Sequence, residues 1–567
     1  MCNAATAGRN KSLFYKDTSR LAQQLLRGHI AGTRKRDARR QACSVNCLED
    51  FLVSGFSDVR RSALIATAVA AMVSTQSALA AADPALEAQL KALSARVQQL
   101  EAALARAQAP LTTAVASPTS VQPPAAVEQR VRVLERKLEV AAEESAAARV
   151  KTPAVSLGEK GLAVATPDGI FEARLRGYVQ IDGRFFHDDK ALTGSAATQD
   201  AFLARRIRPI FEGTVAKQFY YRVMPDFAGS AVTLQDAYAE WRQLPYARVT
   251  VGKFKAPFGL ERLGSATELA FVERGLTNNL VPNRDFGVQI GGEWWGKRVS
   301  YQVGLFNGVP DLGSTGPSDL NDDKDFAGRV FFQPFIEQFG PLQGLGFGLA
   351  GSYGEEQGNE TATGLGSYVT PGQAKFFGYR STPASLVVNG DKLTLAPSLA
   401  STVVGAGERT RYSPQGFWYW RQFGVFGDYV ESSQEVALDQ QRARLSHSAW
   451  QVSGSLVLTG EEASFKGVKP RAAFDPVAGD WGALELVGRY GELDIDQQAF
   501  DQGFADPVKS ASAASAWGLG LNWYLNRHVK LVFDYDETAF VGGGGSKAAP
   551  GNRPNERVVL SRVQLSY

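Results

Sequence analysis

The chain ends in Val559-Leu-Ser-Arg-Val-Gln-Leu-Ser-Tyr567, and this stretch indicates the fold class most specifically. Val563, Leu565 and Tyr567 fall on one face of an extended strand, because side chains of a strand alternate between its two faces. Proteins that cross a bilayer as β-barrels commonly end in such a strand with a terminal aromatic residue. A closed barrel leaves no strand edge unpaired in lipid. We therefore predict a transmembrane barrel that this strand closes.

The same two-residue period recurs along the chain after Gly169. Over 171–182, apolar or small residues alternate with charged or polar ones. Segments of similar character lie at roughly 202–215, 218–228, 232–243, 246–255, 285–296, 298–307, 326–337, 343–354, 374–380, 409–421, 422–433, 447–458, 482–493, 512–525, 528–538 and 556–567. Such segments are long enough to span a bilayer as tilted strands, and no run of about 18 apolar residues offers a spanning helix. We predict an all-β barrel of about 16 antiparallel strands over residues 169–567.

Tryptophan is confined to the part of the chain that we assign to the barrel. All nine tryptophans lie between Trp241 and Trp523, and none precedes residue 169. Aromatic girdles at the two membrane interfaces would explain why many of them fall near proposed strand ends, and ordinary core aromatics are the alternative. The residues near strand ends are Trp241, Trp294, Trp295, Trp418, Trp420 and Trp523.

Residues 58–81 have the pattern of a cleavable secretory signal. Arg60 and Arg61 form a basic start, and the apolar stretch 63–73 is too short to span a membrane. Small residues in Ala78-Leu-Ala80 then suit cleavage before Ala81. We assign residues 53–80 to a signal peptide.

That signal begins far from Met1, which is unusual for a signal peptide. Residues 1–52 are basic and irregular and hold no further methionine. We predict that they are a non-native extension and that translation begins at Leu52 or Val53. Cleavage would also remove all three cysteines, which suits a chain that crosses an oxidising periplasm. The cysteines are Cys2, Cys43 and Cys47.

Residues 81–168 have a helical character instead. Apolar residues spaced alternately by four and three positions form a seam over 86–104, and a second seam covers 127–141. The stretch 110–124 between them is rich in Pro, Ser and Thr and reads as a linker. Seams this short favour association, either between chains or between two helices of one chain. We predict a periplasmic coiled coil with linkers, and we name the cell wall as a candidate partner of this coiled coil.

Six short phrases are spread over the predicted barrel. In order they are Leu234-Gln-Asp-Ala-Tyr-Ala-Glu-Trp241, Val251-Gly-Lys-Phe-Lys-Ala-Pro-Phe-Gly-Leu-Glu261, Leu269-Ala-Phe-Val-Glu-Arg274, Leu458-Thr-Gly-Glu461, Trp481-Gly-Ala-Leu-Glu-Leu-Val-Gly-Arg-Tyr490 and Gly520-Leu-Asn-Trp-Tyr-Leu-Asn526. Together they resemble the phosphate-selective porin O and P family across residues 169–567. The resemblance implies a trimer of 16-stranded barrels in the bacterial outer membrane, each with its own pore. It also implies that the segment after Lys255 folds into the lumen as a constriction loop.

Basic residues expected in the lumen are the candidates for binding a permeating anion. An anion that loses hydration needs fixed donors or positive charge, and the planar arginine fork suits phosphate oxygens. Strand parity places in the lumen Arg174, Arg176, Arg206, Arg208, Arg222, Arg242 and Arg248. The expected loop and its flanks add Lys253, Lys255, Arg262, Arg274 and Arg284, with Ser265 and Thr267 as hydroxyl donors.

The resemblance gives two of these residues a specific role. Arg274 matches the family's arginine after Phe-x-Glu, and Ser265 falls near its serine pair, where Ala266 occupies one serine position. We accordingly predict a passive, anion-preferring channel for phosphate or polyphosphate. The chain after residue 80 is net acidic, so only an unbalanced local cluster would select anions. The alternative for each basic residue is an ion pair with a lumen carboxylate, namely Asp182, Glu212, Asp226 or Glu240.

Other functions stay open on the sequence alone. A general or organic-anion porin has the same fold, and a barrel that anchors a coiled-coil tether needs no conducting pore. An enzyme is disfavoured, because His187, His447 and His528 lie in no nucleophile or metal-binding motif. We expect no cofactor, metal or nucleic-acid partner. The expected partners are outer-membrane lipid, inorganic phosphate or other small anions, and further copies of the chain in a homotrimer.

Overall fold

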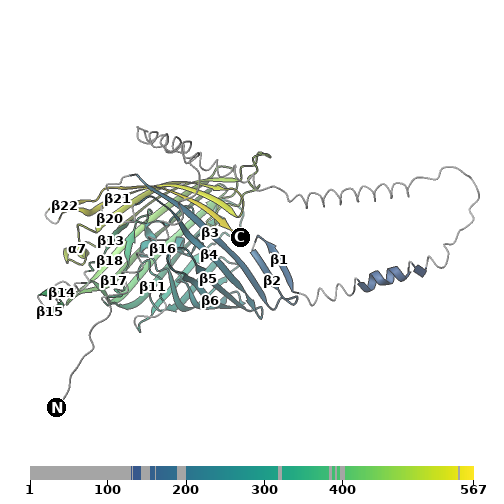
Figure 1. Ribbon diagram of the computed structural model, residues 1–567, viewed down its shortest axis with the longest axis horizontal. Helices are drawn as coiled ribbons and strands as arrows, with labels where there is room; N and C mark the ends of the chain where they lie inside the picture. The colour runs from purple at the N-terminus through teal and green to yellow at the C-terminus, as the bar shows by residue number, and fades with distance from the viewer. Residues whose placement is uncertain are drawn as a thin grey trace, which may run out of the picture. The chain divides into compact units, whose positions relative to one another are not determined.

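The computed structural model describes residues 129–130, 132–141, 143, 153–159, 161–187, 199–316, 322–359, 361–381, 386–389, 392–395, 402–546 and 549–567. Its main feature is a β-barrel (Figure 1). One sheet contains 19 strands, and without the short accessory strands β1, β2 and β22 the barrel wall has sixteen. Every pair of neighbouring wall strands is antiparallel, as the alternation in the sequence predicts.

The wall strands agree with the predicted segments to within a few residues at most ends. In chain order they are β3 (Glu172–Phe186), β4 (Ala201–Val215), β5 (Phe219–Asp226), β6 (Thr233–Leu244), β7 (Ala247–Lys255), β8 (Arg284–Trp294), β9 (Val299–Phe306), β10 (Asp325–Phe332), β11 (Gly344–Gln357), β16 (Val404–Trp420), β17 (Phe423–Leu438), β18 (Gln441–Val457), β19 (Ala483–Asp494), β20 (Ala511–Tyr524), β21 (Val529–Ser546) and β23 (Glu556–Ser566).

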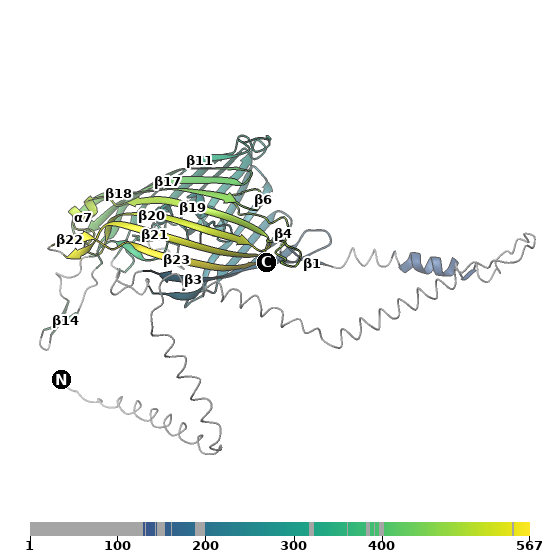
Figure 2. The ribbon, with the colours of Figure 1, turned by 90° about the horizontal axis from the view of Figure 1, so that it is seen from above.

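The barrel closes through its first and last strands. β23 pairs with β3 from Val558 opposite Phe186 to Ser566 opposite Tyr178, and the two strands lie side by side in Figure 2. The backbone of Tyr567 adds two hydrogen bonds with Gly177, each 3.0 Å long. The closure that the C-terminal sequence predicts is therefore present.

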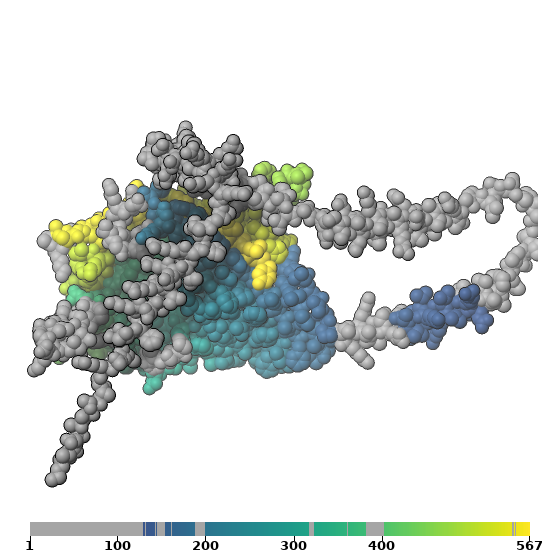
Figure 3. Space-filling view, viewed as in Figure 1, coloured from purple at the N-terminus to yellow at the C-terminus, as the bar shows by residue number. Residues whose placement is uncertain are grey.

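Side chains of the wall alternate between the lumen and the outer surface, as predicted for β3. Gln180 and Asp182 are fully buried, whereas Ile181 between them is 42% exposed. β23 repeats this pattern, with Arg562 buried and Val563 52% exposed. Figure 3 shows the outer surface of the first strands as a continuous wall. An apolar outer face over a polar lumen is what a barrel in lipid requires.

The two ends of the barrel differ in their connections. The short-turn end is the end at which β3 begins and β23 finishes, and most of its connections are tight turns, such as those at 216–218, 245–246 and 525–528. The opposite, long-loop end carries the connection at 358–403 and other extended ones. Aromatic side chains near the short-turn end are exposed, as an interfacial girdle requires. They include Trp294, Trp295, Trp481 and Tyr567.

One predicted wall segment, 374–380, is not part of the wall. It contains β13 (Lys375–Gly378), which pairs with β12 (Ser367–Val369) in a separate two-stranded sheet. Phe376 and Phe377 of β13 are buried in an apolar core inside the barrel. A short strand buried inside the barrel is as rich in apolar residues as a strand of the wall. The sequence pattern alone therefore assigned 374–380 to the wall wrongly. The remaining short strands are β1 (Ala154–Gly158), β2 (Gly161–Ala165), β14 (Leu386–Asn389), β15 (Lys392–Leu395) and β22 (Ala549–Asn552).

Helices are few among the described residues. None of them is both long and apolar enough to cross a membrane. A helix covers 132–141 within the second predicted seam, and its Leu134 and Leu138 are exposed by 59% and 70%. The proposed extension, the signal peptide and the seam at 86–104 lie outside the described residues. The coiled coil stays a prediction.

Candidate functional site: the pore constriction

The segment between β7 and β8, residues 256–283, folds into the lumen and is called the inner loop. It contains α6 (Leu260–Leu263) and the 3-10 helix η3 (Leu276–Leu280). All five residues of η3 are buried, and η3 lies against β17, β18 and β19 across the barrel from the strands that carry the loop. The inward loop that the family resemblance implied is therefore present in the structure.

Side chains of the wall hold the inner loop by its backbone. Several of them, Gln180, Lys530, Asn522 and Arg489 among them, donate to loop carbonyls, and Asp534 accepts from a loop amide. These bonds satisfy backbone groups that would otherwise be buried without partners. They join Gln180 to Ala266 O (2.9 Å), Lys530 to Leu269 O (2.7 Å), Asn522 to Ala270 O (2.9 Å), Arg489 to Glu273 O (2.8 Å) and Val272 N to Asp534 (2.5 Å).

A glycine shapes the entry of the loop into the lumen. Gly259 precedes α6 with a φ of 77°, a backbone conformation that favours glycine. A Cβ at this position would lie 2.7 Å from Cγ1 of Val281, where the loop leaves the lumen again. The close approach of the two loop ends therefore depends on Gly259, which belongs to the second quoted phrase of the sequence.

An arginine cluster surrounds Glu273 of the inner loop. It comprises Arg184, Arg205, Arg206 and Arg562, whose nearest nitrogens lie 3.7, 2.5, 3.6 and 3.6 Å from the carboxylate oxygens of Glu273. Asp182 is the second carboxylate, 2.7 Å from Arg562. Four guanidinium groups thus meet two carboxylates, which leaves the cluster with a formal excess of two positive charges.

The formal excess of two positive charges counts Glu273 as ionised, and its surroundings keep it so. Burial by itself raises the pKa of Glu273, but the charges of Arg205, Arg206 and Arg562 outweigh burial and lower the pKa below its ordinary value. Arginine side chains stay protonated in proteins. Arg184 is the least tightly held member, because its Nε is buried with no hydrogen-bond partner among the described residues.

Three further cations of the loop region have carbonyl partners rather than carboxylates. Lys255 donates to Gly264 O at 2.6 Å, and Arg274 donates to the same oxygen at 3.2 Å. Arg262 donates to Asn278 O at 3.1 Å. Within the described part of the chain none of the three has a carboxylate within 4.0 Å, so their charges are not neutralised by direct ion pairs.

The other predicted basic residues are mostly ion-paired in the lumen, as the alternative interpretation held. Arg222, Arg242 and Arg208 pair with the carboxylates that the sequence analysis named for this role. Arg248 pairs with a carboxylate that it did not name, and Lys253 donates to a carbonyl. The contacts are Arg208 with Asp226 (2.7 Å), Arg222 with Glu212 (2.8 Å), Arg242 with Glu240 (3.1 Å), Arg248 with Glu293 (3.2 Å) and Lys253 with Thr315 O (2.6 Å).

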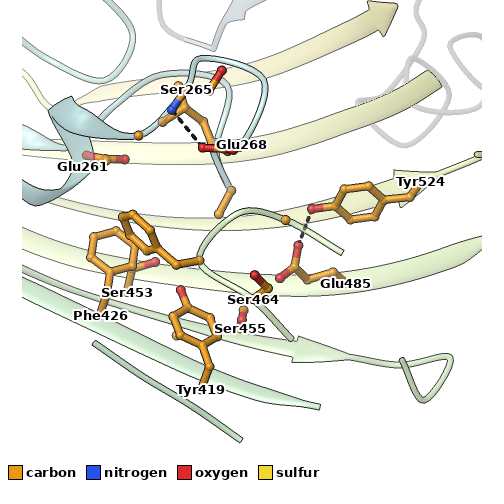
Figure 4. Close-up of a pocket in the computed structure, with 16 residues that line it drawn as sticks. Glu261, Ser265, Glu268, Tyr419, Phe426, Ser453, Ser455, Ser464, Glu485 and Tyr524 are labelled. Carbon is orange, nitrogen blue, oxygen red and sulfur yellow. Dashed lines mark hydrogen bonds between the residues drawn. The ribbon is translucent and has the colours of Figure 1, made fainter. Parts of the chain in front are cut away.

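The bend of the inner loop at residues 264–268 lies where four cavities meet. Ser265 and Glu268 line a narrow cavity of about 30 Å³, with Glu485 among the residues around it (Figure 4). Glu268 also lines cavities of about 350, 500 and 770 Å³. Lys255 and Arg222 line the cavity of 500 Å³, whereas Arg274 lines none of the four. The bend therefore separates these cavities, and we take it as the candidate constriction of the lumen.

Two hydroxyl groups lie together at this bend despite Ala266. Ser265 Oγ is 2.8 Å from Thr267 Oγ1, so alternate residues present their hydroxyls on the same side. Ala266 between them is buried against Tyr178 and Ile210. Because one hydroxyl donates to the other, the pair keeps one hydroxyl hydrogen for a permeating anion, supplied by residues 265 and 267 rather than by neighbouring serines.

Sequence reasoning missed three members of the arginine cluster. Arg205 faces the lumen beside Arg206 because β4 has a bulge there, where Gln180 pairs with Arg206 and Ile181 pairs with Ala204. Parity assigns Arg184 and Arg562 to the lumen, but it gives no reason to single them out. Among the described residues, no group of three His, Cys, Asp or Glu side chains is placed to hold a metal ion.

Comparisons with known proteins agree with this architecture. Residues 179–539 match the sequence profile of the phosphate-selective porin O and P family. Porin O of Pseudomonas aeruginosa is 24% identical over 392 residues, which cover 66% of this chain and 84% of that protein.

Two solved structures are also similar at low identity. The outer membrane channel DcaP of Acinetobacter baumannii is 10% identical with a TM-score of 0.43, over 70% of this chain and 97% of that one. The anion-selective porin from Comamonas acidovorans is 11% identical with a TM-score of 0.40, over 70% of this chain and 100% of that one. The profile match spans well over half of the chain, and it covers the inner loop and most wall strands of the closed barrel. The chain is accordingly an outer-membrane porin that belongs to the phosphate-selective porin O and P family.

Proposed function

We propose that this porin prefers anions and passes inorganic phosphate or polyphosphate. The observation that carries the proposal is the arginine cluster around Glu273, with its formal excess of two positive charges in the lumen. Fixed positive charge in a narrow passage concentrates anions and offsets part of their lost hydration. Arginine forks bind phosphate oxygens in pairs, so the cluster suits phosphate better than a single point charge would.

The constriction adds donors next to this charge. Ser265 and Thr267 offer hydroxyl groups, and Lys255 and Arg274 both bond the carbonyl of Gly264 beside them. An anion at the bend would meet neutral donors first and unpaired cations close behind them. The paired arginines Arg208, Arg222, Arg242 and Arg248 would contribute less, because their carboxylates cancel most of their field.

The proposal is tested with purified mature protein, residues 81–567, in planar bilayers. The reversal potential in a salt gradient is expected to show anion selectivity, and phosphate is expected to block the chloride current. Arg274→Ala should weaken the block about ten-fold, because it removes one positive charge that has no carboxylate partner behind the constriction. Arg298→Gln is the matched control, since its guanidinium pairs with Glu337 outside the lumen at 2.7 Å. Cation selectivity without phosphate block would contradict the proposal.

A general or organic-anion porin is the second candidate. Ala266 favours it, because strict phosphate recognition would benefit from a further hydroxyl at that position. Anion selectivity without block by phosphate would select this function. A barrel that serves only as an anchor for a coiled-coil tether would give no current in the same measurement.

The assembly and orientation belong to the same proposal. The chain forms a homotrimer with one pore in each barrel, and the long-loop end faces the outside of the cell. Residues 1–52 are a non-native extension, residues 53–80 are a signal peptide and residues 81–168 form the periplasmic coiled coil with its linkers. The exposed seam residues Leu134 and Leu138 support an association of the helices.

A further inference from the structure

The largest of the four cavities at the inner-loop bend lies across the lumen from the arginine cluster. Its volume is about 770 Å³, and it lies between β10, β16 and residues 458–482, called the inserted turn because its Phe465 packs inside the barrel. No member of the arginine cluster and none of the predicted anion-binding residues lines it. The cavity therefore adjoins the bend at Gly264 and Glu268 but contains none of the side chains proposed to bind phosphate.

Arg329 of β10 lines this cavity without a counterion. Within the described residues it makes no hydrogen bond or ion pair, and its Nε is buried without an acceptor. Its guanidinium lies 4.4 Å from the ring centroid of Phe331. A guanidinium partly removed from water without a carboxylate is costly, and a bound anion would offset that cost.

The remaining charges of the cavity also favour an anion. Besides Arg329, the lining includes the cations Arg421 and Lys466 and the carboxylates Glu268 and Glu462. Positive charges therefore outnumber negative ones by one. Glu462 and Lys466 are exposed, so their fields are screened, whereas Arg329 is half-buried and acts at short range.

Aromatic rings form one side of the same cavity. Phe331 and Phe417 lie 5.2 Å apart between centroids, and Phe417 stacks on Phe465 at 5.4 Å with an interplanar angle of 16°. Tyr419 meets Phe465 edge to face at 6.4 Å. These rings come from β10, β16 and the inserted turn, so an aromatic wall stands directly beside the unpaired guanidinium. A further aromatic ring can pack against this wall in the edge-to-face or offset-stacked arrangement that aromatic pairs prefer.

We infer that this cavity is a binding site for an aromatic monocarboxylate, of which benzoate is the simplest example. The carboxylate pairs with the guanidinium of Arg329, and the ring lies against Phe417 and Phe465. The arginine fork gives the charge-assisted bonds, and the aromatic wall gives preference for a flat ring over an aliphatic one of similar size. The site does not depend on the preference of the channel for phosphate.

The test uses block of single-channel current by added organic acids, with the mature protein in planar bilayers. Benzoate is expected to block the current at lower concentration than acetate or cyclohexanecarboxylate, and benzyl alcohol is expected not to block. Arg329→Gln should raise the benzoate concentration needed for half block about ten-fold. Arg444→Gln is the control, because Arg444 forms an exposed ion pair with Glu408 at 2.7 Å and does not line this cavity. The benzoate concentration needed for half block of this control variant should equal that of the wild type.

Two further variants keep the inference open to contradiction if Arg329→Gln fails to fold. Arg329→Lys retains the charge but not the fork, and it should give a block between those of the wild type and of Arg329→Gln. Phe417→Leu should reduce the difference between benzoate and cyclohexanecarboxylate. Equal block by benzoate and acetate in the wild type would overturn the site, and so would an unchanged benzoate block in Arg329→Gln. Phosphate block, measured on the same channels, reports separately on the proposed function.

Discussion

Glu268 places a negative charge at the constriction of a pore that we propose to prefer anions. It lines all four cavities that meet at the bend. Its carboxylate accepts a hydrogen bond of 3.0 Å from the amide of Ser265, and no described lysine or arginine lies within 4.0 Å of it. The charge of Glu268 is therefore uncompensated locally, and it opposes the arginine cluster.

Glu268→Gln should consequently raise the permeability ratio of chloride to potassium. Removing one unit charge near the permeation path changes the energy of a passing ion by about 1 kcal/mol, which corresponds to about a five-fold change in the ratio. The reversal potential in a salt gradient measures it. Glu293→Gln is the matched control, since Glu293 is paired with Arg248 at 3.2 Å and lies away from the bend. A lower or unchanged ratio in Glu268→Gln would show that this carboxylate does not face the ion path.

At the residue scale, the sequence predicts which side of the wall a side chain faces better than what that side chain meets there. Parity placed Arg208 and Arg222 in the lumen, and it offered Asp226 and Glu212 as partners, which they have. The alternation did not predict that Arg205 faces the lumen, because a β-bulge in β4 reverses the side on which this residue lies. The convergence of four arginines on Glu273 joins strands far apart in sequence, and no local pattern encodes it.

At the scale of elements, the inner loop is held in the lumen because wall side chains form hydrogen bonds with the backbone of several neighbouring loop residues. Asn522 and Lys530 donate to the carbonyls of Ala270 and Leu269, and both are themselves buried. Loss of these donors would leave two loop carbonyls without partners, at a cost of about 1–3 kcal/mol each. The loop would then move more freely in the lumen.

We therefore expect the double variant Asn522→Leu and Lys530→Met to give a noisier single-channel current with more frequent changes of conductance. The barrel itself should still form, because the wall hydrogen bonds of β20 and β21 are backbone bonds. Gln235→Leu is the control, since its side chain bonds only locally to Thr233 at the surface. A steady current of wild-type conductance in the double variant would mean that these anchors are not needed.

Strands of the wall were predictable, while the segments inside it were harder to place. Alternation located all sixteen wall strands, because lipid on one face and water on the other impose a period of two. β13 and the inserted turn follow no such rule, since Phe377 and Phe465 pack against other side chains inside the barrel rather than between lipid and water. The inner loop could be placed only by family resemblance; its length indicated merely an unusually long connection.

At the scale of the whole molecule, the helix at 132–141 presents apolar residues that a single chain leaves exposed. Leu134 and Leu138 belong to the predicted seam, whereas Val133 and Val140 lie beside it. Association of three copies would bury the seam residues, and burying a leucine contributes about 1.5–3 kcal/mol. The helices would therefore add to the stability of the proposed trimer of barrels.

Replacing Leu134 and Leu138 with Asp should lower the temperature at which the trimer dissociates on a gel, without changing the conductance of a single barrel. Replacing Val133 and Val140 with Asp gives a control on the same helix with the same change of charge. Light scattering of the wild type in detergent should give three times the protomer mass. A monomeric mass would contradict the trimer, and equal dissociation temperatures for the two double variants would contradict the seam.

Because β23 closes the barrel against β3, only a chain that has been synthesised through its last strand can form the closed barrel. Arg562 bonds Asp182 across 380 residues, and the two strands that it joins cannot meet before the whole chain exists. Closing so long a span is slow, because contacts distant in sequence delay folding. A chain cut short before Glu556 would present two bare strand edges, on β21 and β3. Such an open sheet has no stable place in a bilayer, so a truncated product would be left for periplasmic proteases instead of leaking ions through the membrane.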